Sequence, residues 1–182
     1  QAAAVDGKAG VVQTWVSGDG QVDATCVNRG VSGCTLLLIA AEHGHKQLVE
    51  VVLERGAEAD ARDSEGCTAL MAAAAEGHER GAEMVLRHGA EINLQYNLGG
   101  TALLVAAFHN HPAVVLRLLR AGADMTLRVA AGKTALQIAK EEGHAECVRA
   151  FEGHAAAEKA AKEAAWAAGA AERAAERAEA EA

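Results

Sequence analysis

The sequence predicts an all-α solenoid, built from helix–turn–helix–finger units of 33 residues and followed by an alanine-rich C-terminal helix. The main sign is a Gly-x-Thr-x-Leu segment that recurs every 33 residues, in copies that begin at Gly33, Gly66, Gly99 and Gly132. A Gly-His pair, once replaced by Asn-His, and a Gly-Ala pair recur with the same step. Three landmarks that share one period indicate a true internal repeat.

Each element of a unit follows from local residue chemistry. The hydroxyl of Thr35 can cap the first helix, and Gly44 can adopt the left-handed conformation that ends it. In the second helix one apolar stripe is expected, formed by Leu48, Val49, Val52 and Leu53. Gly56 ends this helix, and the polar stretch 58–65 turns back as a finger towards the next unit.

The repeat divides the chain into three parts. Residues 1–32 are expected to form a truncated N-terminal unit with a lengthened finger. Residues 33–153 form four further units, namely 33–65, 66–98, 99–131 and 132–153. Residues 154–182 form the Ala/Glu/Arg-rich C-terminal helix. A lone unit cannot bury its apolar stripe, so stability must come from stacking.

The units resemble the ankyrin repeat. The family's Thr-Pro-Leu-His segment appears here as Thr35-Leu36-Leu37-Leu38, Thr68-Ala69-Leu70-Met71, Thr101-Ala102-Leu103-Leu104 and Thr134-Ala135-Leu136-Gln137. Every unit lacks the Pro and the His of that segment, whereas the Gly-His and Gly-Ala landmarks are kept. The resemblance covers roughly residues 2–153. It implies a concave face, made of finger tips and first helices, on which proteins of this family bind their partners.

The C-terminal segment is rich in alanine, the strongest helix former, and carries i,i+4 pairs such as Glu158–Lys162. Its charged residues are expected on one side, with Trp166 interrupting an alanine face. One hypothesis is a solvated helix that caps or extends the solenoid, and the other is a docking helix with Trp166 as its anchor. A self-associating coiled coil is disfavoured, because no Leu or Ile heptad supports one.

Charge and cysteine content limit the partners and the compartment. With 17 Lys+Arg against 25 Asp+Glu the formal net charge is −8, which disfavours a nucleic-acid partner. No apolar run approaches the ~20 residues of a membrane helix, so direct membrane insertion is not expected. Four scattered cysteines are too few for a disulfide-stapled secreted domain, and no signal peptide is visible. We therefore expect an intracellular protein, first of all in the cytoplasm, with a processed organellar protein as the alternative.

Catalytic and cofactor-binding residues are not predicted. The segment Ala131-Gly132-Lys133-Thr134 is similar to the end of a phosphate-binding loop. That motif needs Gly five positions before Gly132, where the chain has Leu127. The repeat already explains these residues, so we expect no cofactor and no enzymatic activity.

Metal binding and disulfide bonding are not predicted either. Pairs such as His43 with His45 suggest metal ligands, but no cysteine or carboxylate set completes a site. Cys34 and Cys67 occupy the same slot in successive units, and stacking at helix spacing would keep their Cα atoms beyond the ~7 Å that a disulfide can bridge. We expect them to be free thiols.

Surface recognition remains, and the fourth unit is its expected centre. Tyr96, Leu98 and Phe108 place large apolar groups on the expected concave face, where they would anchor a partner unless they pack between neighbouring fingers. Five carboxylates around them form an acidic rim, namely Glu42, Glu65, Glu76, Glu141 and Glu142. The other expected contacts are His43, His109, Lys133 and, on the C-terminal helix, Trp166. This rim suits a basic or apolar–basic segment of another protein.

We therefore predict a non-enzymatic protein–protein interaction module, which acts as a scaffold or as an accessory or assembly subunit of a larger complex. Two alternatives stay open. In one, the solenoid is a spacer and the C-terminal helix is the main docking element. In the other, the chain is a regulatory ankyrin fragment of a longer enzyme.

Overall fold

The computed structural model describes residues 22–23, 25–28 and 30–180. The elements run in the order β1 (Cys26–Asn28), β2 (Val31–Cys34), α3 (Leu36–Glu42), α4 (Lys46–Glu54), α5 (Ala69–Ala75), α6 (Glu79–Arg87), α7 (Ala102–Phe108), α8 (Pro112–Arg120), α9 (Ala135–Glu141) and α10 (Ala145–Ala180). The helices expected for the truncated first unit fall within residues 1–21, outside the described residues.

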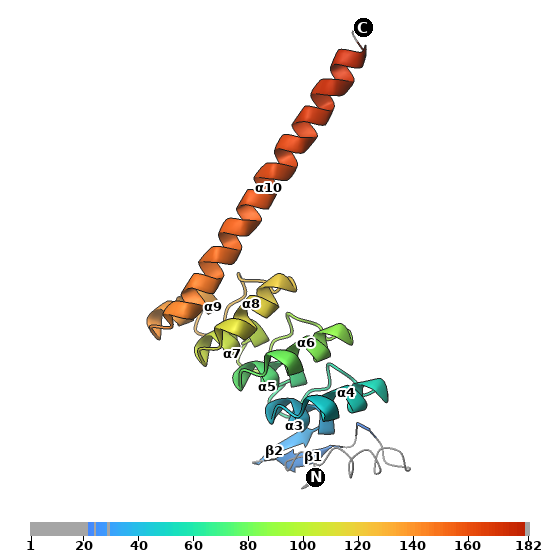
Figure 1. Ribbon diagram of the computed structural model, residues 1–182. Helices are drawn as coiled ribbons and strands as arrows, with labels where there is room; N and C mark the ends of the chain where they lie inside the picture. The colour runs from blue at the N-terminus through green and yellow to red at the C-terminus, as the bar shows by residue number, and fades with distance from the viewer. Residues whose placement is uncertain (1–21, 24, 29, 181–182) are drawn as a thin grey trace.

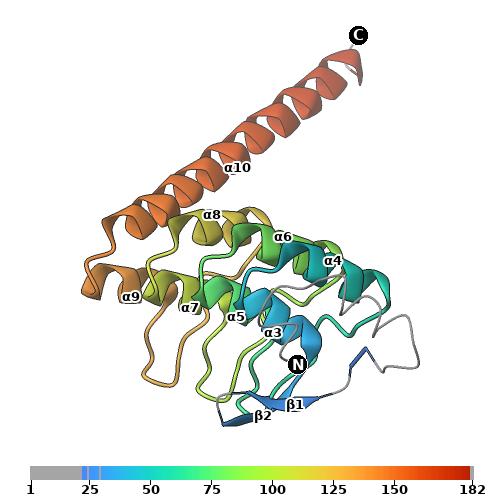
Figure 2. The same ribbon diagram turned by 60° about the horizontal axis from the view of Figure 1, so that its bottom comes forward.

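The helices form two layers with fingers along one side. Figure 2 shows α3, α5, α7 and α9 side by side in one layer, while α4, α6, α8 and the start of α10 form the second. The fingers project beyond the first layer. Together, the fingers and the first helices α3, α5, α7 and α9 make up what we call the finger/first-helix face. Figure 1 shows the units stacked from the β1–β2 hairpin to α10, which extends far beyond the stack.

The lengthened first finger contains an antiparallel hairpin, which the sequence did not predict. Strands β1 and β2 pair with Cys26 opposite Cys34 and Asn28 opposite Val31. The register shifts between these two pairs, because β2 has one more residue than β1 in this interval. Gly33 supplies the positive φ of 77° that this irregularity uses.

Threonine hydroxyls start all four first helices, as the sequence predicts. The hydroxyl of Thr35 accepts a hydrogen bond from the N–H of Leu38 at 3.2 Å, and Thr68 and Thr101 act in the same way. At the fourth of these helices the backbone N–H of Thr134 also donates to Oε1 of Gln137 at 2.9 Å, which completes a capping box.

A histidine joins each unit to the one before it. The Nε2–H of His78 donates to the carbonyl oxygen of Glu42 at 3.1 Å, and that of His111 donates to Ala75 at 2.8 Å. In the last unit His144 donates through Nδ1 to Ala107 at 2.9 Å. The recurring histidines of the sequence are therefore inter-unit hydrogen-bond donors.

Backbone bonds join the fingers at the same step. The N–H of Ser64 donates to the carbonyl of Ser32 at 2.9 Å, and that of Asn97 donates to Glu65 at 3.0 Å. The Ala130 N–H donates to the carbonyl of Leu98, also at 3.0 Å. Buried alanines such as Ala73 and Ala106 let the first helices pack closely behind these fingers.

The last unit carries a polar end face. Gln137 and Lys140 occupy the positions that buried Leu104 and Ala107 occupy one unit earlier, and both are exposed. Lys140 forms an ion pair with Glu152 at 3.4 Å. Polar residues at these positions end the stack without leaving an apolar surface.

Helix α10 runs without a break through the predicted boundary between residues 153 and 154. Gly153 does not have a positive φ and lies inside the helix. An interior glycine costs a helix only about 1 kcal/mol relative to alanine, and the alanine-rich sequence around it favours the helix. The boundary marks the end of burial instead: Phe151 is 1% exposed, whereas residues 155–168 are exposed.

Candidate functional site

A hollow of about 370 Å³ lies on the finger/first-helix face, between the fourth and fifth units. Its lining includes four apolar residues that are buried or half-buried, namely Leu104, Val105, Val129 and Ile138. Tyr96 also lines it and is half-buried against the core, and five exposed side chains surround it, namely Phe108, His109, Lys133, Glu141 and Glu142. The structure thus brings together six of the residues that the sequence analysis singled out.

Tyr96 reaches the hollow because Gly100 has no side chain. A Cβ atom at Gly100 would lie 2.2 Å from Cε1 of Tyr96, so the ring occupies space that any other residue would need. The Tyr96 N–H donates to the carbonyl of Gly100 at 3.0 Å, which fixes the finger at this point. In the other units the position equivalent to Gly100 is occupied by Cys34, Cys67 and Lys133. The sequence places Gly100 on the expected concave face but indicates no role for it, although Gly99-Gly100 is the one Gly-Gly pair in the repeated segment.

Phe108 is the last residue of α7 and is 52% exposed. Its ring meets the ring of His109 edge-on, with the centroids 5.1 Å apart. His109 is itself oriented by a bond from Nδ1–H to the carbonyl of Val105 at 3.1 Å. The positions equivalent to Phe108 are Ala75 in the preceding unit and Glu141 in the following unit. Among these three units, only the fourth has an aromatic residue at this position.

Charges flank the hollow on the side of the fifth unit. Lys133 and Glu141, both of the fifth unit, form an ion pair with one another. Glu142 is exposed, and within the described part of the chain its carboxylate has no ion-pair partner. This carboxylate is available to a positively charged group.

The other six expected contacts lie outside the hollow, five of them in the solenoid and one, Trp166, on α10. Leu98 is 64% exposed in the third finger, close in sequence to Tyr96, but does not line the hollow. Glu65 is exposed in the finger of unit 33–65, and Glu76 is exposed at the C-terminal end of α5 in unit 66–98. Glu42 is half-buried and accepts a hydrogen bond from Asn28 Nδ2 at 3.0 Å, and His43 next to it bonds to the carbonyl of Ile39.

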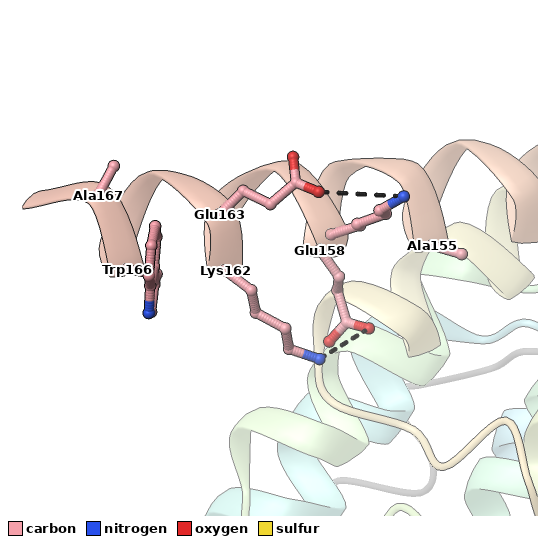
Figure 3. A pocket seen from close by; sticks show the side chains of 7 residues that line it. Ala155, Glu158, Lys162, Glu163, Trp166 and Ala167 are labelled. Atoms are coloured by element: carbon pink, nitrogen blue, oxygen red, sulfur yellow. Dashed lines mark ion pairs between the residues drawn. The ribbon is translucent and has the colours of Figure 1, made fainter. Parts of the chain in front are cut away.

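Trp166 lies on α10 (Figure 3), and this helix extends far beyond the stack that carries the finger/first-helix face (Figure 1). Its side chain is 73% exposed. It stands beside charged residues and not, as expected, on an alanine face, because Lys162 and Glu163 precede it by four and three residues and share its side of the helix. Figure 3 shows these side chains with the Lys162–Glu158 pair at 4.0 Å. A second hollow, of about 710 Å³, lies beside Trp166. Every residue that lines it comes from α10, so it is an open surface of that helix.

All four cysteines are free thiols. Burial raises the pKa of Cys34, and burial together with Asp63 and Glu65 raises the pKa of Cys67 to about 11. Among the described residues no group of three His, Cys, Asp or Glu side chains is placed to hold a metal ion.

Comparison with known proteins agrees with this architecture. A family model described as ankyrin repeats, in three copies, matches residues 1–96, and a model of one ankyrin repeat matches residues 98–129. The chain belongs to the ankyrin-repeat family. The all-α repeat solenoid with its C-terminal helix is thereby confirmed. Ankyrin repeats are protein–protein interaction modules, and in general they have no catalytic activity.

The fifth unit lies beyond both matches but has the geometry of an ankyrin repeat, with its capped first helix and its inter-unit histidine. No curated protein matches the chain. In the portion of this ankyrin-repeat chain that the structure describes, no helix is both long and apolar enough to cross a membrane.

Proposed function

We propose that the finger/first-helix face binds a segment of another protein, and that the hollow between the fourth and fifth units is the centre of this surface. The observation that carries the proposal is the exposure of Phe108 beside an apolar hollow of about 370 Å³. Ligand-binding hollows combine apolar walls with a few polar groups. An exposed aromatic residue next to such a hollow is a suitable anchor, because aromatic side chains dominate many interface energies.

The charges define the partner segment more closely. Glu142 is an available carboxylate at one side of the hollow, and Glu76 is exposed on the unit before Phe108. The formal charge of the chain is −8. The segment that fits presents an apolar side chain to the hollow and a Lys or Arg to Glu142, since opposite charges at a rim steer association and set specificity.

In this proposal the protein is a non-enzymatic scaffold or an accessory subunit of a larger assembly. The support is the family's use of stacked repeats for binding and the hydrogen bonds that join successive units into one platform. We place this role inside the cell, with the cytoplasm as the expected compartment.

A peptide library displayed on phage and selected against the full chain tests the proposal. Selected peptides should combine an aromatic or long aliphatic residue with a nearby Lys or Arg. The double variant Tyr96→Ala/Phe108→Ala should bind them at least about fivefold more weakly, which is about 1 kcal/mol. The control His88→Ala, on the second-helix layer, should bind them normally. Equal binding to the double variant and to the wild type would refute the proposal.

The second candidate function makes α10 the docking element, and the 73% exposure of Trp166 is the observation in its favour. Removal of residues 157–182 separates the two candidates, because the buried Phe151 remains in place. If the hollow is the binding site, the shortened chain keeps its affinity for the selected peptides and for the native partner. If α10 is the docking element, the shortened chain and Trp166→Ala both lose the native partner.

A further inference from the structure

Three of the four cysteines lie in the first two fingers, away from the hollow. Cys26 and Cys34 face one another across the β1–β2 hairpin, as Cα partners in the antiparallel ladder. Cys67 occupies the equivalent slot one unit further along. Cys147 is fully buried in α10, where its Sγ lies 3.6 Å from Oδ1 of Asn110.

The hairpin geometry suits a covalent bond between Cys26 and Cys34. Directly opposed residues in an antiparallel pair have Cα atoms about 4.5–5.5 Å apart and side chains on the same face. A disulfide requires a Cα separation of about 4.4–6.8 Å, and the spacing of a directly opposed pair falls within this range. Cys67 is separated from Cys34 by one unit of the stack, and units pack about 8–10 Å apart.

The two thiols differ in access. Cys26 is half-buried, whereas Cys34 is 2% exposed and its Sγ–H donates to the carbonyl of Val31 at 3.4 Å. A reagent in solution therefore reaches Cys26 first. Burial raises the pKa of Cys34, and thus Cys34 reacts as a thiolate more readily as the pH rises.

We propose that Cys26 and Cys34 form a reversible disulfide by exchange with a low-molecular-weight disulfide such as glutathione disulfide. The Cys26 thiolate attacks one sulfur of glutathione disulfide, which forms a mixed disulfide and releases one glutathione. The Cys34 thiolate then attacks the Cys26 sulfur and releases the second glutathione. Two protein thiols are oxidised by two electrons in total, one glutathione disulfide is reduced to two thiols, and the cysteine protons pass to those thiols through the solvent.

The bond would fix the first finger at the N-terminal end of the finger/first-helix face. The hairpin contacts this face through the Asn28–Glu42 hydrogen bond at 3.0 Å. It also contacts the next finger, through the Ser32 carbonyl and the Ser64 N–H at 2.9 Å. Oxidation therefore acts on a segment joined to both the first helix and the neighbouring finger.

Mass spectrometry of the full chain tests the proposal. The reduced protein is incubated with glutathione disulfide, free thiols are alkylated, and the digest is searched for linked peptides. We expect a Cys26–Cys34 linkage, a chain lighter by two hydrogen atoms, and reversal by dithiothreitol. Cys67→Ser and Cys147→Ser are the matched controls and should oxidise like the wild type.

The variants separate the two steps of the exchange. Cys34→Ser should stop at one glutathione on Cys26, while Cys26→Ser should remain largely unmodified. In the wild type the mixed disulfide should be shorter-lived at pH 9 than at pH 7. A Cys34–Cys67 linkage, or wild-type protein that ends with glutathione on Cys26 and a free Cys34, would overturn the proposal. The wild-type linkage map needs no substitution, so a variant that fails to fold does not remove the test.

Discussion

The ring of His111 lies against the preceding unit, with Nε2 2.8 Å from the carbonyl oxygen of Ala75, which is 36 residues earlier in the chain. This close approach requires Gly77, since a Cβ atom there would lie 2.5 Å from Nδ1 of the same ring. In the fourth unit Asn110 occupies the glycine position, with φ 59°. By analogy with His111, His144 would donate through Nε2 to the carbonyl of Phe108. The side chain of Asn110 occupies that space, so His144 donates through Nδ1 to the carbonyl of Ala107 instead.

Gly77→Ala should destabilise the solenoid more than Gly89→Ala. Both glycines have a positive φ, 74° and 87°, so both substitutions incur the cost of about 1–2 kcal/mol for a left-handed alanine. Only at Gly77 does the new Cβ meet a neighbour, whereas none lies within 4 Å at Gly89. Overpacking of this kind adds about 1–3 kcal/mol. Urea unfolding followed by circular dichroism measures the difference, and equal losses would show that the His111 contact does not constrain the glycine.

The two phenylalanines should differ strongly in their contribution to stability. Phe151 is 1% exposed and Phe108 is 52% exposed. We expect Phe151→Ala to lower the free energy of unfolding by about 3–5 kcal/mol. Phe108→Ala should change it by less than about 1 kcal/mol, as for other surface substitutions. Thermal and urea unfolding check this, and a large loss at Phe108 would mean that its ring serves packing and not binding.

The thiol of Cys67 should react slowly with alkylating reagents at neutral pH. Its raised pKa, about 11 against 9.0 for an ordinary thiol, lowers the thiolate fraction about a hundredfold at pH 8. The more basic thiolate is also about tenfold more nucleophilic, which offsets part of this hundredfold loss in reaction rate. Iodoacetamide should therefore label Cys67 about tenfold more slowly in the native chain than in urea-unfolded chain, and labelling should accelerate as the pH rises towards 11. Equal rates at pH 8 in the two states would contradict the pKa shift.

The polar end face should keep the chain from associating end to end. Gln137→Leu with Lys140→Ala restores the residues found one unit earlier and leaves them uncovered. Exposed apolar patches of this kind promote association, so the double variant should show a higher mass by light scattering as its concentration increases. Lys159→Ala with Glu163→Leu makes a similar change on the exposed part of α10 and serves as the control. Equal association of the two variants would argue against a specific capping role.

The repeated part of the fold could be predicted in detail because each boundary depends on local chemistry. The threonine caps, the left-handed Gly44 and the buried stripe that contains Leu48 and Val52 all lie where the sequence predicts them. The polar end face could also be predicted, since Gln137 and Lys140 stand at positions that hold apolar residues in the other units. That signal appears only when the units are compared column by column.

Other features depend on longer-range or competing effects. The β1–β2 hairpin sits in the finger that departs from the repeat, so periodicity carries no information about it. The sequence places a boundary after Gly153, but α10 continues through it, because helix-favouring alanines outweigh one glycine when no left-handed turn is needed. The six residues around the hollow were named from their positions in the repeat. The role of Gly100 in making room for Tyr96 follows only from the side-chain packing, which the sequence does not contain.

The most direct test of the central claim is photo-crosslinking in the native cells. A photoreactive phenylalanine is placed at position 108, and at His88 on the second-helix layer as the control. The account predicts a defined crosslinked partner from position 108 that is absent from position 88, and that is lost when Glu141→Lys and Glu142→Lys reverse the charge beside the hollow. Identical products from both positions, or a partner captured only from position 88, would contradict binding at the finger/first-helix face.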